Sequence, residues 1–494
     1  MNHMGRKYFI LFLFCDVIVI AQNNASFRKQ FEQLKQRQRL EYEDFRVQAN
    51  KEYAEFMRKA WVWCQAKPGF PLPLCPDPPL PAPTPPGQKE ALDVPERLSP
   101  FEMVIVAPSM IEQPKPITPI EEIAEITELF HFKAYGTDMK VRLNNKLRFS
   151  LKNINEDEVA NQWAALSKPD YYNLLYDCLT LRNQYKLCDW AYLNVLERLT
   201  EEFLGKQSSE AVLLQAFLFN QSGYKVRLGR SKTNRLYVMV ASLHQIYNMS
   251  YFNLKGDCFY PLNYKEDGLY IYDNAYPKEQ QMSLIVGKEQ LFMDTEVESR
   301  TLCSKGEYGV QVTLSFNKNL IDFYNTYPQS SINNDGTTKW TFYANTPLSE
   351  IVRKKLYPVL RTAISGKSER DAANILINFV QTALIYGYDD EIWGGDRPFF
   401  ADETLYYPYS DCEDRAILYS RLVRDLLHLE TVLLYYPGHL AMAICFNEKV
   451  GGKSFLIQGK TYTYCEPTCT GYAPIGWCPK DLETIPPKVV LLND

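Results

Sequence analysis

Residues 407–427 read YPYSDCEDRAILYSRLVRDLL, and this stretch decides how the C-terminal part of the chain folds. Asp411, like the serine before it, is a good N-cap type, and the apolar residues behind it recur at helical spacing. The pattern predicts a helix with Cys412 in its first turn. The unpaired N–H groups and the positive dipole end of that turn favour a thiolate and could hold an oxyanion. Glu413 and Asp414 repel a thiolate, so a paired imidazolium must outweigh them.

Two later segments supply the other groups of a possible catalytic triad. The first, YYPGHLAMAICF (435–446), predicts a buried strand with His439 at its edge. The second, GKTYTYCEPT (459–468), predicts a strand that ends at Glu466, immediately before a proline. If the two strands pair, Glu466 could accept the second N–H of His439 and so fix its tautomer and orientation.

Each of these residues also has an ordinary structural interpretation. A single cysteine on a helix usually belongs to the core, a single histidine is usually a hydrogen-bonded structural residue, and a glutamate before proline commonly ends a strand. The chain nevertheless offers Cys412, His439 and Glu466 in that order and at equal spacing. The combination favours a catalytic triad over three unrelated residues.

The motifs DCEDRA, GH before an apolar strand, and EPT resemble the transglutaminase-like superfamily of papain-fold cysteine enzymes, over about residues 346–480. The resemblance implies a helix that carries Cys412 and packs on an antiparallel sheet that carries His439 and the acid. It also implies thiol acyl chemistry on amides. Glu466 stands where aspartate is commoner in the family, which keeps the charge and lengthens the side chain.

Residues 170–265 could be a degenerate second copy of the same unit. Aligning SSEAVLLQAFLFNQSGYKVRLGRSKTNRLYVMVAS and KGDCFYPLN with the C-terminal motifs puts Ser209 at the cysteine position, Arg235 at the histidine position and Tyr260 at the glutamate position. Such a copy could not run the reaction and would be a binding or packing module. The alternative is that any helix followed by two strands looks alike, so a repeat requires the same strand order and direction in both units.

The N-terminus predicts export, to the periplasm, the cell surface or the medium. Residues 1–21 combine two basic residues, a short apolar stretch and small residues suited to signal-peptidase cleavage. An uncleaved signal is the alternative, and it would be the only reason to expect membrane attachment.

The cysteine count agrees with export. Of 12 cysteines, one would leave with the signal peptide and one would be the nucleophile, and the others could form disulfides. The expected local pairings lie among Cys465, Cys469 and Cys478, and between Cys64 and Cys75. A zinc site at the first three is less favoured because their spacing is irregular and no histidine lies beside them.

Composition and patterning divide the rest of the chain. Apolar residues at three- and four-residue steps predict one long amphipathic helix from Ala25 to Trp63, whose apolar face needs a partner on this chain or another. A proline-rich stretch then predicts an extended connector. We expect six parts: a signal peptide (1–21), the amphipathic helix (22–67), a Pro-rich linker (68–100), an α+β domain (101–268), a β-rich spacer (269–345) and a transglutaminase-like catalytic domain (346–494).

The sequence therefore predicts an α+β chain and an exported cysteine enzyme, a peptidase or amidase if water accepts the acyl group and a cross-linking enzyme if an amine does. No cofactor and no metal ion are expected. The substrate class is a protein, a peptide or a cell-wall peptide. A net charge of −5 and no basic stripe argue against nucleic acid. The alternative is an inactive interaction or scaffold protein of the same fold, docking through the helix at 25–63.

Overall fold

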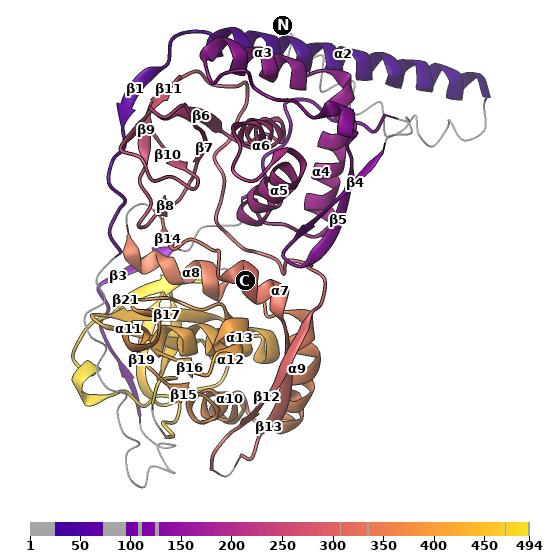
Figure 1. The fold of residues 1–494 in the computed structure, drawn as a ribbon. Coiled ribbons are helices and arrows are strands. Elements are labelled where there is room, and N and C mark those ends of the chain that lie inside the picture. The colour runs from indigo at the N-terminus through magenta and orange to yellow at the C-terminus, as the bar shows by residue number, and fades with distance from the viewer. Residues whose placement is uncertain are drawn as a thin grey trace, which may run out of the picture.

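The computed structural model describes residues 25–72, 95–106, 111–123, 128–306, 308–332, 335–469 and 471–492. The chain is a mixed α+β protein, as the sequence predicts. It forms two units, one above the other in Figure 1, and each contains an antiparallel sheet with helices against it. The predicted signal peptide at 1–21 and most of the Pro-rich linker lie outside the described residues.

The upper unit begins with the long helix α2 (Ala25–Met57), and a β-hairpin and four further helices follow it along the chain. These elements are β4 (Leu129–Ala134), β5 (Thr137–Arg142), α3 (Glu156–Leu166), α4 (Tyr172–Gln184), α5 (Asp189–Leu204) and α6 (Ser209–Gln221). Its sheet has the strand order β1-β11-β6-β7-β10-β9. Its strands are β1 (Val62–Gln65), β6 (Val226–Arg230), β7 (Leu236–Ala241), β9 (Phe252–Leu254), β10 (Asp257–Pro261) and β11 (Gly268–Ile271).

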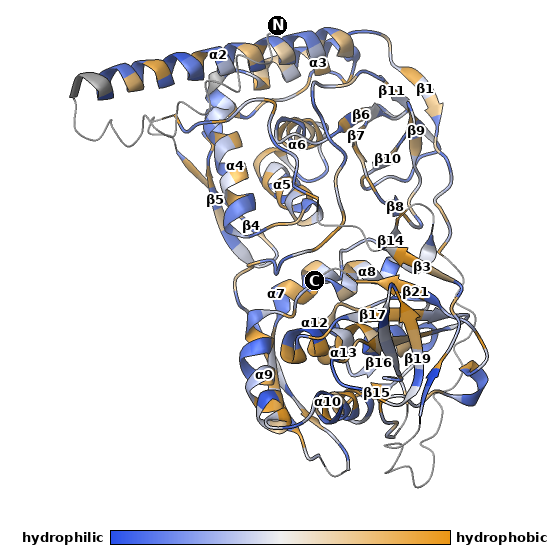
Figure 2. Ribbon diagram, turned by 180° about the vertical axis from the view of Figure 1, so that it is seen from behind, coloured by the Kyte–Doolittle hydropathy of each residue, from blue (hydrophilic) through white to orange (hydrophobic). Residues whose placement is uncertain are grey.

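The lower unit packs helices against a larger sheet of order β2-β19-β20-β18-β17-β21-β3. Its strands are β2 (Glu96–Leu98), β3 (Met103–Val106), β17 (Thr431–Tyr436), β18 (His439–Ile444), β19 (Gly452–Ile457), β20 (Lys460–Cys465) and β21 (Lys488–Leu491). Its helices include α9 (Glu350–Ile364), α10 (Glu369–Ala383), α11 (Asp389–Trp393), α12 (Ala401–Tyr406) and α13 (Cys412–Leu427). In Figure 2 the strands β3 and β21 are strongly apolar; Val489 and Val490 of β21 are buried, whereas β3 is an edge strand with Met103 exposed.

The two sheets repeat one topology. Read from β9, the upper order is β9-β10-β7-β6-β11, and the lower sheet contains β19-β20-β18-β17-β21 in the corresponding places. All four neighbour pairs are antiparallel in both units. In each unit a helix comes directly before the strand that is earliest in the sequence: α6 before β6 in the upper unit and α13 before β17 in the lower unit. The requirement that a repeat keep strand order and direction is therefore met for five strands and one helix.

The edges of the sheets differ from each other and from the expected segment boundaries. Residues 96–106, expected at the junction of linker and first domain, supply β2 and β3, which pair in parallel with β19 and β21 at opposite edges of the lower sheet. Residues 62–65 are a strand of the upper sheet rather than the end of a helix. A chain segment before the upper unit thus completes the lower one.

The segment 269–345, expected to be a β-rich spacer, is mixed. Its first residues belong to β11 of the upper sheet, and a hairpin of β12 (Glu296–Cys303) and β13 (Gln311–Asn317) follows. It also contains the helices α7 (Lys318–Tyr324) and α8 (Lys339–Ala344). The spacer prediction was wrong on these helices, whose apolar residues are buried in the main core.

The long N-terminal helix ends at Met57, earlier than predicted, and among the described side chains of this helix the buried ones begin at Arg46. Tyr53 is buried against Trp163, with ring centroids 5.3 Å apart. The N-terminal end of α2 extends beyond the unit in Figure 1. Before Arg46, Leu40 and Phe45 are 54% and 50% exposed. Among the described residues, no helix is long and apolar enough to span a membrane.

Candidate active site

Cys412 is the first residue of α13, where the sequence places it. The Asp414 carboxylate accepts the N–H of Asp411 (3.2 Å) and also the N–H of Phe399 (2.8 Å), and these two bonds fix the helix start. The Cys412 side chain is only 4% exposed. The helix start is thus built from local sequence, and one bond ties it to a distant loop.

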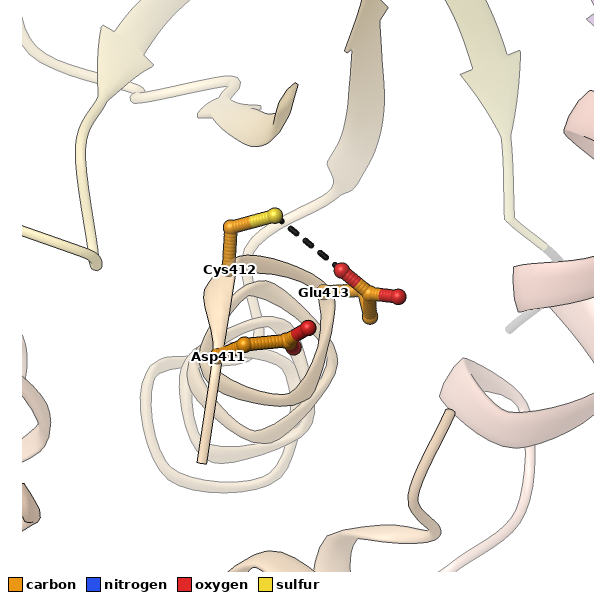
Figure 3. Close-up of side chains that lie close together, drawn as sticks. All are labelled: Asp411, Cys412 and Glu413. Atoms are coloured by element: carbon orange, nitrogen blue, oxygen red, sulfur yellow. Dashed lines mark hydrogen bonds between the residues drawn. The ribbon is translucent and has the colours of Figure 1, made fainter. Parts of the chain in front are cut away.

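The thiol contacts a carboxylate rather than an imidazole. Cys412 Sγ donates to Glu413 Oε2 at 3.0 Å, and Figure 3 shows the sulfur directed at that oxygen. Burial raises the pKa of the Cys412 thiol well above its usual range, and the charges of Glu413 and Asp411 raise it further, while the Leu440 N–H lowers it by hydrogen bonding. The expected thiolate-favouring environment is therefore not the resting state, because burial first, and then the charges of Glu413 and Asp411, disfavour the thiolate.

His439 and Glu466 form the pair that the strand ends predict. Strands β18 and β20 are antiparallel neighbours, and His439 Nε2 lies 3.0 Å from Glu466 Oε2. Glu466 also accepts from the Tyr464 hydroxyl (2.5 Å) and from the N–H and hydroxyl of Thr468. Both members of the pair are buried, at 7% and 2% exposed.

The electrostatics of this pair favour its charged form. Burial opposes the charge on His439, but the Glu466 carboxylate beside it outweighs burial and raises the pKa of the imidazole. Burial likewise opposes the charge on Glu466, while His439 and the hydrogen bonds from Thr468 and Tyr464 lower its pKa. The imidazole can therefore carry a proton near neutral pH.

The thiol and the imidazole are neighbours without a direct hydrogen bond between the described atoms. Cys412 Sγ accepts from the N–H of Leu440, the residue after His439. The Glu413 charge acts on both Cys412 and His439. The three predicted residues thus belong to one buried cluster, in which the Glu413 charge raises the pKa of both the thiol and the imidazole.

Sequence reasoning missed the acidic surroundings of the thiol. Asp389 begins α11 and Asp396 lies in the loop between α11 and α12, and oxygens of these two and of Glu413 lie within 4.8 Å of one another. Buried Lys339, on α8, pairs with Asp396. Burial and the Glu413 charge raise the pKa of Asp389 to about 8 and that of Asp396 to about 7. Oxygens at this separation could hold a divalent cation, whose ligands lie across a shell about 5 Å wide.

The acidic composition of residues 386–409 was a sequence signal for these carboxylates, but nothing in the sequence indicated that Lys339 lies beside them. The lysine lies far away in sequence, and only the packing of α8 against α13 brings it to the site.

The expected local disulfides are not formed. Cys465 and Cys478 are free cysteines, so no pairing among Cys465, Cys469 and Cys478 exists in this structure. Cys478 instead lies 3.6 Å from the ammonium of Lys453. Cys64 is also a free cysteine, and Cys75 lies outside the described residues.

The upper unit has a corresponding site without catalytic groups. Ser209 begins α6, and its hydroxyl accepts from the N–H of Leu236 (3.3 Å), the residue after Arg235. Cys412 accepts from Leu440 in the same way. This hydrogen bond matches Ser209 and Arg235 to the thiol and imidazole positions, as predicted.

The third equivalence was wrong: Asn263, not Tyr260, corresponds to Glu466. In the lower unit Cys465 pairs with Met442, two residues after Leu440. In the upper unit Leu262 donates to Val238, two residues after Leu236. Leu262 therefore corresponds to Cys465, and Asn263 to Glu466. Both strands also follow a turn with two positive φ angles, Lys255-Gly256 above and Gln458-Gly459 below. Counting from either feature reaches Asn263, whereas the buried Tyr260 hydroxyl accepts from Ile246 at the core.

Comparison with known proteins adds no family assignment. No family model, no curated protein and no solved structure matches this chain.

Proposed function

We propose that this chain is a cysteine enzyme of transglutaminase-like type that performs acyl transfer at amide bonds. The observation that carries the proposal is the buried hydrogen bond between His439 and Glu466, next to a helix whose first residue is Cys412. A cysteine, a histidine and a carboxylate with these neighbours form the constellation of a nucleophile, a base and the group that orients the base.

In the proposed reaction Cys412 Sγ attacks the carbonyl carbon of an amide. His439 takes the thiol proton and gives it to the leaving amine, which departs as the thioester forms. Glu466 holds the imidazole in one tautomer and stabilises its protonated form. N–H groups of the first turn of α13 are available for the oxyanion.

Glu413 has to release the thiol before this attack. In the resting structure the carboxylate accepts the thiol proton's hydrogen bond and its charge disfavours a thiolate. A substrate or a bound cation that neutralised Glu413 would remove that obstacle, since the carboxylate's charge is what raises the thiol pKa beyond the effect of burial.

The second half of the reaction depends on the acceptor. Water would give a peptidase or amidase, and an amine would give a cross-linking enzyme. We favour hydrolysis because water is the more abundant acceptor for the thioester, and peptide or cell-wall peptide is the substrate class that suits an exported enzyme of this kind.

The test is incubation of the protein with a casein substrate and a fluorescent primary amine, with Cys412→Ser as control. Amine incorporation that requires Cys412 would identify a transferase, and new peptide fragments or released ammonia that require it would identify a hydrolase. If neither product depends on Cys412, the enzyme proposal fails.

A noncatalytic interaction protein is the second candidate, and one observation favours it. The thiol is buried and bonded to Glu413, not to His439. The exposed apolar residues on the part of α2 before Arg46, among them Leu40 and Phe45, would then serve as the docking surface. Removal of residues 25–45 would abolish partner capture but leave any Cys412-dependent turnover unchanged.

A further inference from the structure

A large cavity lies beside the first turn of α13 and is not part of the triad. Its volume is about 1000 Å³, the upper end of the range of small-molecule and peptide sites. Four segments wall it: the loop between β12 and β13, the C-terminal end of α10, β15 (Ile385–Tyr386) and the loop after β20. These segments are far apart in sequence, so the cavity is a product of the fold.

The cavity is adjacent to the thiol. Tyr386 lines it, and β15 pairs in parallel with β16 (Tyr409–Ser410), which places Tyr386 opposite Ser410, two residues before Cys412. Arg415 also lines it and lies one helical turn after Cys412 on α13. The cavity wall therefore includes one residue paired with the strand before the nucleophile and one residue after it.

One polar side chain on the cavity wall is uncommitted. Asn378, on α10, is 2% exposed, and its carboxamide makes no hydrogen bond to the described protein, with Oδ1 fully buried. The neighbouring Gln381 is different, since its carboxamide bonds the backbone of Glu466 and Ala473 and holds the fold. A buried amide that lacks partners costs free energy. The carbonyl oxygen of a peptide group is an acceptor for the amide NH2 of Asn378, whose Oδ1 is the fully buried atom.

The rest of the wall is largely apolar or aromatic. Tyr308 and Tyr472 contact one another, with ring centroids 6.1 Å apart and hydroxyls 3.4 Å apart; Tyr308 comes from the loop between β12 and β13 and Tyr472 from the loop after β20. Leu384 and Ile385 line the same space, and Ile385 is 56% exposed. Such walls suit an apolar or aromatic side chain better than a charged one.

We propose that this cavity binds the peptide segment next to the attacked amide, with Asn378 pairing to its backbone and the tyrosines contacting an apolar or aromatic side chain. The inference rests on the proposed function for the identity of the reacting group. The binding itself does not require turnover. It makes the substrate an extended polypeptide with an apolar residue near the reacting carbonyl.

The test measures binding without chemistry, using full-length protein carrying Cys412→Ala. The probes are two fluorescein-labelled hexapeptide amides that differ only by phenylalanine or alanine at the third position, read by fluorescence anisotropy. Burial of one large apolar side chain predicts that the phenylalanine peptide binds roughly 10-fold tighter or more. Equal affinity for the two peptides, or no binding of either, would overturn the proposal.

Two variants locate the site. Asn378→Ala and Tyr472→Ala, each in the Cys412→Ala protein, should weaken binding of the phenylalanine peptide, while Tyr42→Ala on the exposed face of α2 should not. Asn378→Ala should leave the melting temperature unchanged, because its side chain holds nothing in the fold. Unchanged affinity in both cavity variants would refute the placement, as would preferential binding of a chito-oligosaccharide probe over both peptides.

The two proposals fail separately. If Asn378-dependent peptide binding is found but no product forms with an intact thiol, the cavity assignment stands and the enzyme proposal fails. If turnover depends on Cys412 but the cavity variants bind and turn over peptides like the unaltered protein, the enzyme proposal stands and the cavity assignment fails.

Discussion

Replacing Glu466 with alanine should destabilise the protein by about 4 kcal/mol, because this carboxylate is the acceptor at the centre of a buried network. It accepts from His439 at 3.0 Å, from the Tyr464 hydroxyl at 2.5 Å and from two groups of Thr468. Each buried donor left without an acceptor costs about 1–3 kcal/mol, and removal of one member of a buried ion pair costs about 3–5 kcal/mol. These costs overlap and do not add, which sets the value near 4.

The loss should depend on pH, with a sign fixed by the two pKa shifts. The pKa of His439 is raised above its ordinary 6.5, so its contribution is complete below that pH and is lost as the pH rises through the folded value. The pKa of Glu466 is lowered below its ordinary 4.5, so its contribution is complete above that pH and is lost as the pH falls through the folded value. The difference in the free energy of unfolding between the unaltered protein and Glu466→Ala should therefore be largest between pH 4.5 and pH 6.5.

The assay is urea unfolding across this pH range, with Glu466→Gln and Glu52→Ala as controls. The glutamine keeps the volume and one acceptor, so it should lose about half as much. Glu52 is exposed on α2, and its removal should change stability by less than about 0.5 kcal/mol. A loss at Glu466→Ala below about 1 kcal/mol would refute the claim that this network is buried and satisfied.

Three further predictions concern other parts of the chain. Glu413→Gln should speed alkylation of Cys412 by iodoacetamide at pH 7, because it removes a charge that raises the thiol pKa. Slower alkylation would contradict this and would mean that Glu413 is the base that takes the thiol proton. Burial lowers the pKa of His244 to about 4, so the free energy of unfolding should fall by about 3 kcal/mol as the pH drops from 6.5 to 4. His244→Gln should remove most of that pH dependence in urea titrations. If the variant's stability fell with pH as steeply as that of the unaltered protein, His244 would not be a buried neutral imidazole. Tyr53→Ala should cost about 3–5 kcal/mol, whereas Phe45→Ser should cost less than about 0.5 kcal/mol, measured by thermal unfolding. Equal losses would mean that Phe45 is packed as well.

The start of α13 and the His439–Glu466 hydrogen bond could be predicted because their signals are local. An N-cap aspartate followed by apolar residues at helical spacing defines a helix start whatever surrounds it. An apolar run that begins with a histidine and a run that is followed by a glutamate need only pair in antiparallel fashion to bring those side chains together. The chain pairs them as β18 and β20.

The resting state of Cys412 could not be predicted, because it depends on groups from separate segments. Glu413 was recognised as an opposing charge, but the balance also involves Lys339, Asp389 and Asp396. The degree of burial sets the largest contribution to the thiol pKa, and burial is a property of the packed structure. The spacing of residues in the sequence does not predict the degree of burial.

The short edge strands β2 and β3 were missed for a related reason. Three or four residues carry no readable alternation, and both lie beside a proline-rich stretch that predicts an extended chain. Their pairing with β19 and β21 is a contact over more than 350 residues of sequence. The Tyr260 error was avoidable, because counting from the Lys255-Gly256 turn reaches Asn263.

The most direct measurement for the central claim is acetylation of the protein by an activated ester, p-nitrophenyl acetate, with the modified cysteine located by mass spectrometry. The account predicts an acetyl group on Cys412, formed at least about 100-fold more slowly in His439→Ala, which is the lower end of a general base's contribution. Exposed Cys303 serves as the internal reference for an unassisted thiol. Acetylation of Cys303 without Cys412, or a rate at Cys412 that is indifferent to His439, would contradict the account.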